Sequence, residues 1–158
     1  MENMMTGATE IRKVLEGSPL FRELTADELD QVVPICREAA YAAGLSVIAE
    51  GDAARDLYVV DEGKVMVEMN LSAYPGMVQS ALIEHIPPGE PFGWSAAAGS
   101  RVYTMTARCL EQTRVVAIDG QKLLDLFDVN PVIGFKVMSG LVEVVSQRVS
   151  SVIHSALQ

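Results

Sequence analysis

The chain has 158 residues, of which 49% are hydrophobic and 21% are charged, and its formal net charge is −9. This composition is typical of one soluble folded domain with its own core, and it excludes a disordered chain. The acidic balance argues against nucleic-acid binding by this chain alone, because surfaces for phosphate backbones need clustered Lys and Arg. The N-terminus lacks the basic start and apolar run of a signal peptide, so we expect a cytoplasmic protein.

Helical patterns predict an N-terminal helical region over 1–34. Apolar residues at helical spacing predict a short helix over 8–16. A second helix over 26–33 is indicated by Thr25 and Glu28, which have the spacing of a capping box.

A β-rich region follows over 35–119, with short runs of Val, Ile, Tyr and Leu between Gly, Asp and Pro. Their spacing of about 8 to 12 residues is typical of a β-sandwich or barrel. Tyr74 to Gly76 is expected to form the tip of a hairpin between the fourth and fifth strands. The expected strands are 36–41, 45–49, 56–61, 63–71, 78–86, 102–109 and 112–118.

Helical spacing returns over 120–158, in a C-terminal part of the same domain. It predicts a short helix over 120–128 and a long helix over 131–156 that begins at Pro131. Charged residues interrupt the apolar positions of the long helix, so it is not expected to span a membrane.

Two apolar stripes run along this long helix. One is a seam of alternating three- and four-residue steps, and its residues are Phe135, Met138, Val142, Val145, Val149 and Val152. The other stripe consists of Ile133, Val137, Leu141 and Val144. Two stripes require either one wide buried face or two partners. We favour two partners, with the second stripe on the β core and the seam in a homodimer over 131–156.

The stretch 89–109 has the order of a binding cassette: a turn, a run of small residues and an alternating segment. In such a layout several backbone N–H groups can converge on one ligand atom.

This order of elements resembles the cyclic nucleotide-binding domain of the catabolite-activator and FNR-type regulator superfamily. The resemblance covers nearly the whole chain. Its carriers are Ser18-Pro19-Leu20-Phe21, Glu50-Gly51-Asp52, Leu57-Tyr58-Val59-Val60, Gly63-Lys64-Val65, Pro88-Gly89-Glu90, Phe92-Gly93 and Ala107. It implies a mainly β fold with flanking helices, a double-stranded β-helix or cupin-like jelly roll, with N-terminal helices and a long C-terminal helix.

The resemblance also implies a binding site in the cassette. In the family's cyclic-nucleotide binders a glutamate follows PheGly and an arginine lies about ten residues further on, but here Trp94 has the glutamate position and Tyr103 or Thr104 the arginine position. A buried phosphodiester needs a charged partner, so this sequence argues against binding of cAMP or cGMP in the family's manner. The candidate ligand-binding residues are Gly93, Trp94, Ser95, Ala96, Arg101, Tyr103 and Thr104.

Two of these residues leave alternatives open. A shifted loop would bring Arg101 to an anion, whereas an ordinary loop leaves it solvated at the tip. Trp94 is either a lid over an apolar pocket or a core plug.

No metal site and no enzymatic activity are expected, because neither the two histidines nor Ser95 has the partners that such chemistry needs. The eight methionines leave haem open as a ligand, although core methionines are more often packing residues. Three hypotheses remain: a dimeric sensor domain with an unidentified ligand, a ligand-free dimerisation or protein-docking module, and the sensory half of a truncated transcription regulator.

Overall fold

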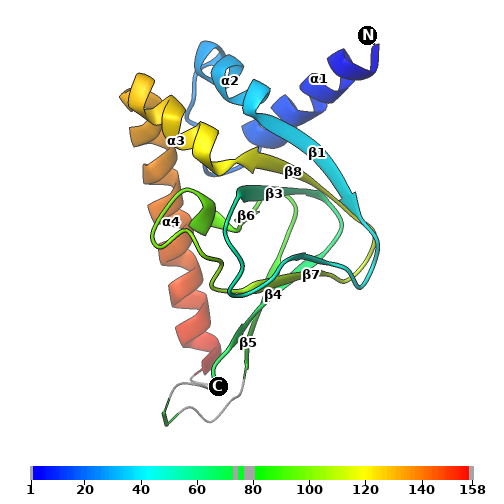
Figure 1. Ribbon diagram of the computed structural model, residues 1–158, viewed down its shortest axis with the longest axis vertical. Coiled ribbons are helices and arrows are strands. Elements are labelled where there is room, and N and C mark those ends of the chain that lie inside the picture. Colours follow the sequence, from blue (N-terminus) through cyan, green and yellow to red (C-terminus); the bar gives the residue numbers. More distant parts are fainter. Residues whose placement is uncertain (1, 73–74, 77–80, 157–158) are drawn as a thin grey trace.

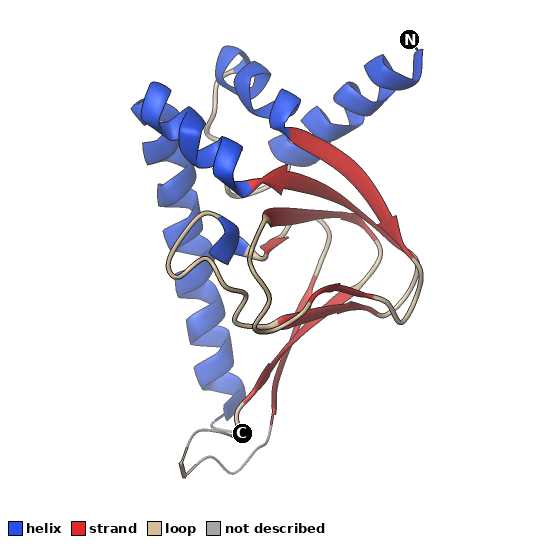
Figure 2. Cartoon of the chain, in the orientation of Figure 1, coloured by secondary structure: helices blue, strands red, loops and turns tan. Residues whose placement is uncertain are grey.

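The computed structural model describes residues 2–72, 75–76 and 81–156. Two four-stranded antiparallel sheets enclose a core, with helices at one end and a long helix along one side (Figures 1 and 2). The fold is therefore mainly β with flanking helices, as the sequence predicts. The elements are α1 (Glu2–Glu16), α2 (Ala26–Val32), η1 (Val33–Ile35), β1 (Cys36–Tyr41), β2 (Ser46–Ile48), β3 (Asp56–Glu62), β4 (Val65–Asn70), β5 (Ala81–Ile86), β6 (Pro91–Phe92), η2 (Trp94–Ala96), β7 (Thr106–Cys109), β8 (Thr113–Asp119), α3 (Gly120–Val129) and α4 (Pro131–Ala156).

One sheet has the strand order β1-β8-β3-β6 and the other has β2-β7-β4-β5. The centre of the first sheet is buried on both faces, because the runs 57–60 in β3 and 115–118 in β8 lie between the second sheet and the helices. This explains why their sequences read as continuous apolar runs instead of alternating ones.

The strand predicted over 102–109 is wrong in its first half. β7 begins only at Thr106, and Val102 makes no more than an isolated bridge with Ala53. The backbone N–H of Tyr103 donates to the carbonyl oxygen of Asp52 at 2.9 Å, outside the sheet ladder. The sequence also missed β6, whose two residues are too few to show an alternating pattern.

Other boundaries differ by a few residues. α1 begins at Glu2, well before the expected helix over 8–16, and the expected strands over 45–49 and 63–71 are shorter at both ends. Of the expected strand over 78–86, residues 81–86 form β5, while 78–80 lie outside the described residues, as does Tyr74 of the predicted hairpin tip.

The capping box at α2 is confirmed: the hydroxyl of Thr25 accepts from the N–H of Glu28, and the Glu28 carboxylate accepts from the N–H of Thr25. The same carboxylate accepts a hydrogen bond from the ammonium group of Lys136 at 2.6 Å. Because Lys136 lies on α4, this contact ties the N-terminal helices to the long helix.

α4 packs on the rest of the domain through one of its two apolar stripes. Ile133, Val137, Leu141 and Val144 are all at least 93% buried. The alternative of one wide buried face is wrong for the single chain, because Phe135, Val142 and Val149 of the seam are 76%, 65% and 52% exposed. The other seam residues, Met138, Val145 and Val152, are half-buried.

Gly140 lies where α4 approaches the loop after α1 most closely. A Cβ atom there would lie 2.5 Å from the carbonyl oxygen of Pro19, so only glycine permits this packing distance. Among the described residues, no helix is long and apolar enough to cross a membrane.

Candidate functional site

The cassette has its predicted beginning. Gly93 adopts the left-handed conformation with φ of 75°, and the short helical turn η2 follows directly. Gly93 is packed tightly against β3, since a Cβ atom there would lie 3.3 Å from the carbonyl oxygen of Asp56 and 3.3 Å from the ring of Tyr58. The start of the cassette is therefore fixed to the centre of the first sheet.

Beneath the cassette lies a cavity of about 20 Å³. This volume has room for about one water molecule. The cavity is enclosed by residues of β2, β4, the cassette and α4, namely Ile48, Val67, Phe92, Gly93, Trp94, Ser95, Tyr103, Thr104, Met105 and Arg148.

Tyr103 is a fixed wall of this cavity. Its hydroxyl donates to the carbonyl oxygen of Asp56 at 2.7 Å and accepts from the N–H of Asp56 at 3.2 Å. The side chain is buried, and burial raises the pKa of the phenol, which stays neutral at pH 7. The two hydrogen bonds hold the ring of Tyr103, one of the two residues at which the resemblance implies a cationic anchor.

Arg148 on α4 closes the cavity from the helix side. Its guanidinium carbon lies 4.7 Å from the centroid of the Trp94 ring, a cation–π distance. It also donates to the carbonyl oxygen of Pro91 and lies 3.8 Å from the carboxylate of Glu90. Burial lowers the pKa of Arg148 to about 10, so the group is still charged at pH 7.

Sequence reasoning missed this arginine. Trp94 and Arg148 are separated by more than fifty residues, and the arginine lies in a helix whose pattern indicates only packing. The one feature of the sequence that could have drawn attention to Arg148 is its charge, which lies between positions 145 and 149 of the apolar seam.

Five of the seven candidate residues line the cavity: Gly93, Trp94, Ser95, Tyr103 and Thr104. Ala96 does not. It is fully buried against Gly120, where a Cβ atom would lie 2.2 Å from the carbonyl oxygen of Ala96, so η2 abuts the first residue of α3.

Arg101 does not line the cavity either. The interpretation as a solvated loop tip is wrong for part of its side chain, because the Nε atom is buried and has no hydrogen-bond partner in the described part of the chain. Its φ of 64° is left-handed, which is uncommon for a residue other than glycine.

The cavity as it stands is far smaller than a cyclic nucleotide or a haem group. Its volume is that of about one water molecule, and its lining includes Trp94, Tyr103 and Thr104, the residues at the sequence positions of the family's charged anchors. The one cation in the lining, Arg148, is already engaged by Glu90 and the Pro91 carbonyl.

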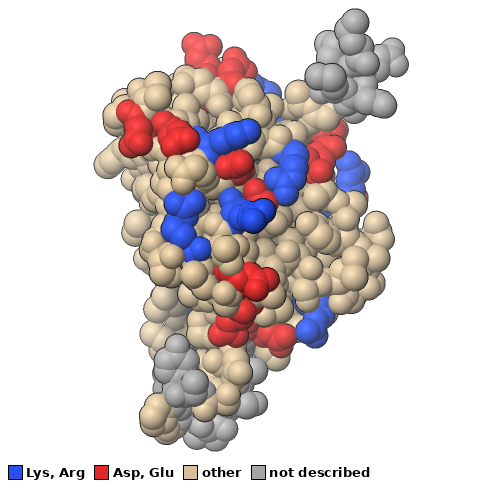
Figure 3. Space-filling model, viewed as in Figure 1, with Lys and Arg blue, Asp and Glu red and all other residues tan. Residues whose placement is uncertain are grey.

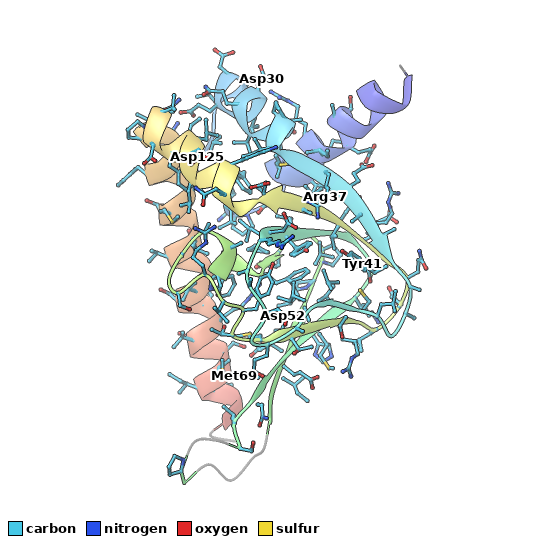
Figure 4. The ribbon with its side chains drawn as sticks, in the orientation of Figure 1. Asp30, Arg37, Tyr41, Asp52, Met69 and Asp125 are labelled. Carbon is cyan, nitrogen blue, oxygen red and sulfur yellow. The ribbon has the colours of Figure 1, made fainter. Side chains whose placement is uncertain are left out.

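A more open depression of about 250 Å³ shares Ile48 and Tyr103 with this cavity and is also lined by Arg55 and by Asp52, which Figure 4 labels. On the face in Figure 3, Lys and Arg side chains lie among Asp and Glu side chains and do not form one basic patch. Within the described ranges, no group of three or more His, Cys, Asp or Glu side chains is arranged to hold a metal ion.

Comparison with known proteins gives a consistent result. The family model of the cyclic nucleotide-binding domain matches residues 38–130. The cyclic AMP receptor protein of Thermus thermophilus is 27% identical over 113 residues, which are 71% of this chain and 50% of that protein. The chain thus spans about half the length of this curated relative.

Solved structures show the same fold. The catabolite activator protein of Thermus thermophilus has a TM-score of 0.66 and 25% identity, over 85% of this chain and 59% of that one. A cyclic nucleotide-binding domain from Methylobacillus flagellatus has a TM-score of 0.76 and covers 95% of this chain and 82% of that one. At 17% identity, the second likeness concerns the fold alone.

Proposed function

Because the chain belongs to the cyclic nucleotide-binding domain family, we propose that it is a cytoplasmic regulatory domain that does not bind cAMP or cGMP in the family's usual manner. In this proposal the protein forms a homodimer through the seam of α4, and the regulatory output is the position of that helix.

The observation that carries the proposal is the filled cassette. Trp94 has the family's glutamate position in the sequence and Tyr103 or Thr104 its arginine position, and all three residues line a cavity of only about 20 Å³. A nucleotide would have to displace a tyrosine that makes two hydrogen bonds to Asp56, and the residues lining the cavity include no glutamate for its ribose and no arginine other than Arg148, which is already engaged.

The exposed seam supports the dimer. Phe135 and Val142 leave large apolar side chains in water in the single chain, on the face of α4 opposite the β-roll. A second copy of α4 would cover these side chains, and a two-fold axis would bring the same residues of both helices together. The same seam on a helix of another protein is the docking alternative.

Thermal unfolding with added nucleotide tests the ligand half of the proposal. We expect millimolar cAMP or cGMP to leave the melting temperature unchanged, since a ligand of the native state would raise it by mass action. The Thermus cyclic AMP receptor protein serves as the positive control. A saturable increase with either nucleotide would contradict the proposal and would show that Trp94 and Tyr103 can leave the cavity.

A further inference from the structure

Arg148 has an unusual setting for a charged residue on an outer helix. Although arginine is charged, the side chain of Arg148 is only 15% exposed. The guanidinium offsets its loss of hydration through the Trp94 ring, the Pro91 carbonyl and the Glu90 carboxylate.

Few side chains in the C-terminal half of α4 are in contact with the rest of the described structure. After Val144, every described side chain up to residue 154 is exposed except those of Val145, Arg148 and Val152, which are half-buried. A second tie to the roll is the hydrogen bond from the Ser151 hydroxyl to Glu84 at 3.2 Å. Arg148 therefore makes most of the described polar contacts that hold the C-terminal half of α4.

The other side of the contact is tightly packed on the first sheet. Glu90, Pro91 and Trp94 belong to the turn, strand and helical turn that open the cassette, and Phe92 between them stacks on Tyr58 at 5.1 Å between ring centroids. A displacement of these residues would disturb the centre of the first sheet. The contact thus joins the mostly exposed C-terminal half of α4 to the packed start of the cassette.

We propose that the Arg148 side chain takes the place of a ligand beside the cavity beneath the cassette. Its contacts with Trp94, Glu90 and Pro91 hold α4 against the cassette when no ligand is bound. The inference rests on the proposed regulatory function, since it gives the chain's own arginine the place that a ligand would take. Anything that enters the cassette must first release Arg148, and its release frees the C-terminal half of the helix that carries the dimer seam.

The chain contains a single tryptophan, Trp94, so its fluorescence reports on this contact directly. In Arg148→Met, which keeps an apolar side chain but loses the charge, we expect stronger acrylamide quenching of Trp94. We also expect amide exchange over 145–152 to become about tenfold faster, the factor that corresponds to about 1.4 kcal/mol. The matched control is Arg22→Met, because Arg22 also lies 3.8 Å from a glutamate, Glu143 of α4, but is 51% exposed.

Unchanged quenching and unchanged exchange in Arg148→Met would overturn the proposal, as would equal effects of Arg22→Met. If Arg148→Met does not unfold cooperatively, Trp94→Leu takes its place: it replaces the aromatic ring with a smaller apolar side chain, and faster exchange over 145–152 is again the expected result. Unchanged exchange in that variant also contradicts the proposal.

Failure of the proposed dimer is distinguishable from failure of this contact. A wild-type protein that sediments as a monomer contradicts the dimer, but the fluorescence and exchange of Arg148→Met still decide whether the arginine holds the helix. Conversely, a wild-type dimer with an inert Arg148 contradicts only the internal contact.

Discussion

At the scale of single residues, Arg101 carries a conformational cost that a glycine would not. Its left-handed backbone costs a side-chain-bearing residue about 1–2 kcal/mol, and its buried Nε atom lacks a hydrogen-bond partner within the described residues. Residues in such conformations cluster at functional segments, and Arg101 lies in the cassette beside the loop of Asp52.

We expect Arg101→Gly to raise the free energy of unfolding by about 1 kcal/mol, because the gain at positive φ exceeds the entropy that glycine adds to the unfolded chain. Urea unfolding with an unchanged slope measures the difference. Ser100→Gly is the neighbouring control, and its φ is not in the left-handed region, so it should lower stability. A loss of stability in Arg101→Gly would show that the guanidinium holds the loop.

Sequence reasoning placed some of the site residues but not their contacts. Trp94 and Tyr103 stand out because the resemblance fixes what should be at those positions, and the structure puts both in the cavity wall. Arg148 and Glu90 gave no such signal, since their relation depends on how α4 crosses the roll. Long-range contacts between single side chains have no periodic pattern to reveal them.

At the scale of elements, Glu28 has two roles. It caps the start of α2 and it pairs with Lys136, which links α2 to α4. The hydrogen bond from Lys136, followed by that from the N–H of Thr25, lowers the pKa of Glu28 below its ordinary value of 4.5. A carboxyl with a lowered pKa stabilises the folded state above its unfolded pKa, and this contribution is lost as the pH falls through the folded value.

Glu28→Gln should therefore lower stability at pH 7, and the difference from wild type should shrink as the pH falls below 4.5. Urea midpoints across this range measure it. Glu23→Gln is the charge-matched control, because Glu23 is exposed and has no ion pair or hydrogen bond within the described ranges. A Glu28→Gln difference that persists unchanged at low pH would contradict the assignment.

Local signals predicted the elements better than the loops. The capping box of α2 and the start of α4 at Pro131 depend on residues within one helical turn, and both are confirmed. The expected strand over 102–109 failed because alternation alone does not show which partner a backbone pairs with. There the chain uses its polar groups to fix Tyr103 and Arg101 against the loop over 50–54.

At the scale of the whole molecule, the seam of α4 is exposed in the single chain and would be buried in the proposed dimer. Val142 lies near the middle of the seam and is 65% exposed, so a charge there is tolerated by the isolated chain but not by a packed helix pair.

We expect Val142→Asp to sediment as a folded monomer at concentrations where the wild type is a dimer. Val129→Asp is the control, since Val129 at the end of α3 is 83% exposed and lies off the seam, and this variant should remain dimeric. An unchanged dimer in Val142→Asp would contradict the assignment of the seam, and a monomeric wild type would contradict the dimer itself.

The N-terminal part of α4 is held more firmly than its C-terminal part, because Gly140 lets the helix approach the backbone of Pro19 closely. The helix is clamped by Pro19 and by its buried stripe, which ends at Val144, whereas the twelve residues from Val145 to Ala156 extend about 18 Å beyond the stripe. A small tilt at the clamp becomes a displacement of several ångströms at the far end. In the proposed dimer, a side-chain movement at the cassette would therefore become a larger change in the distance between the C-terminal ends of the two α4 helices.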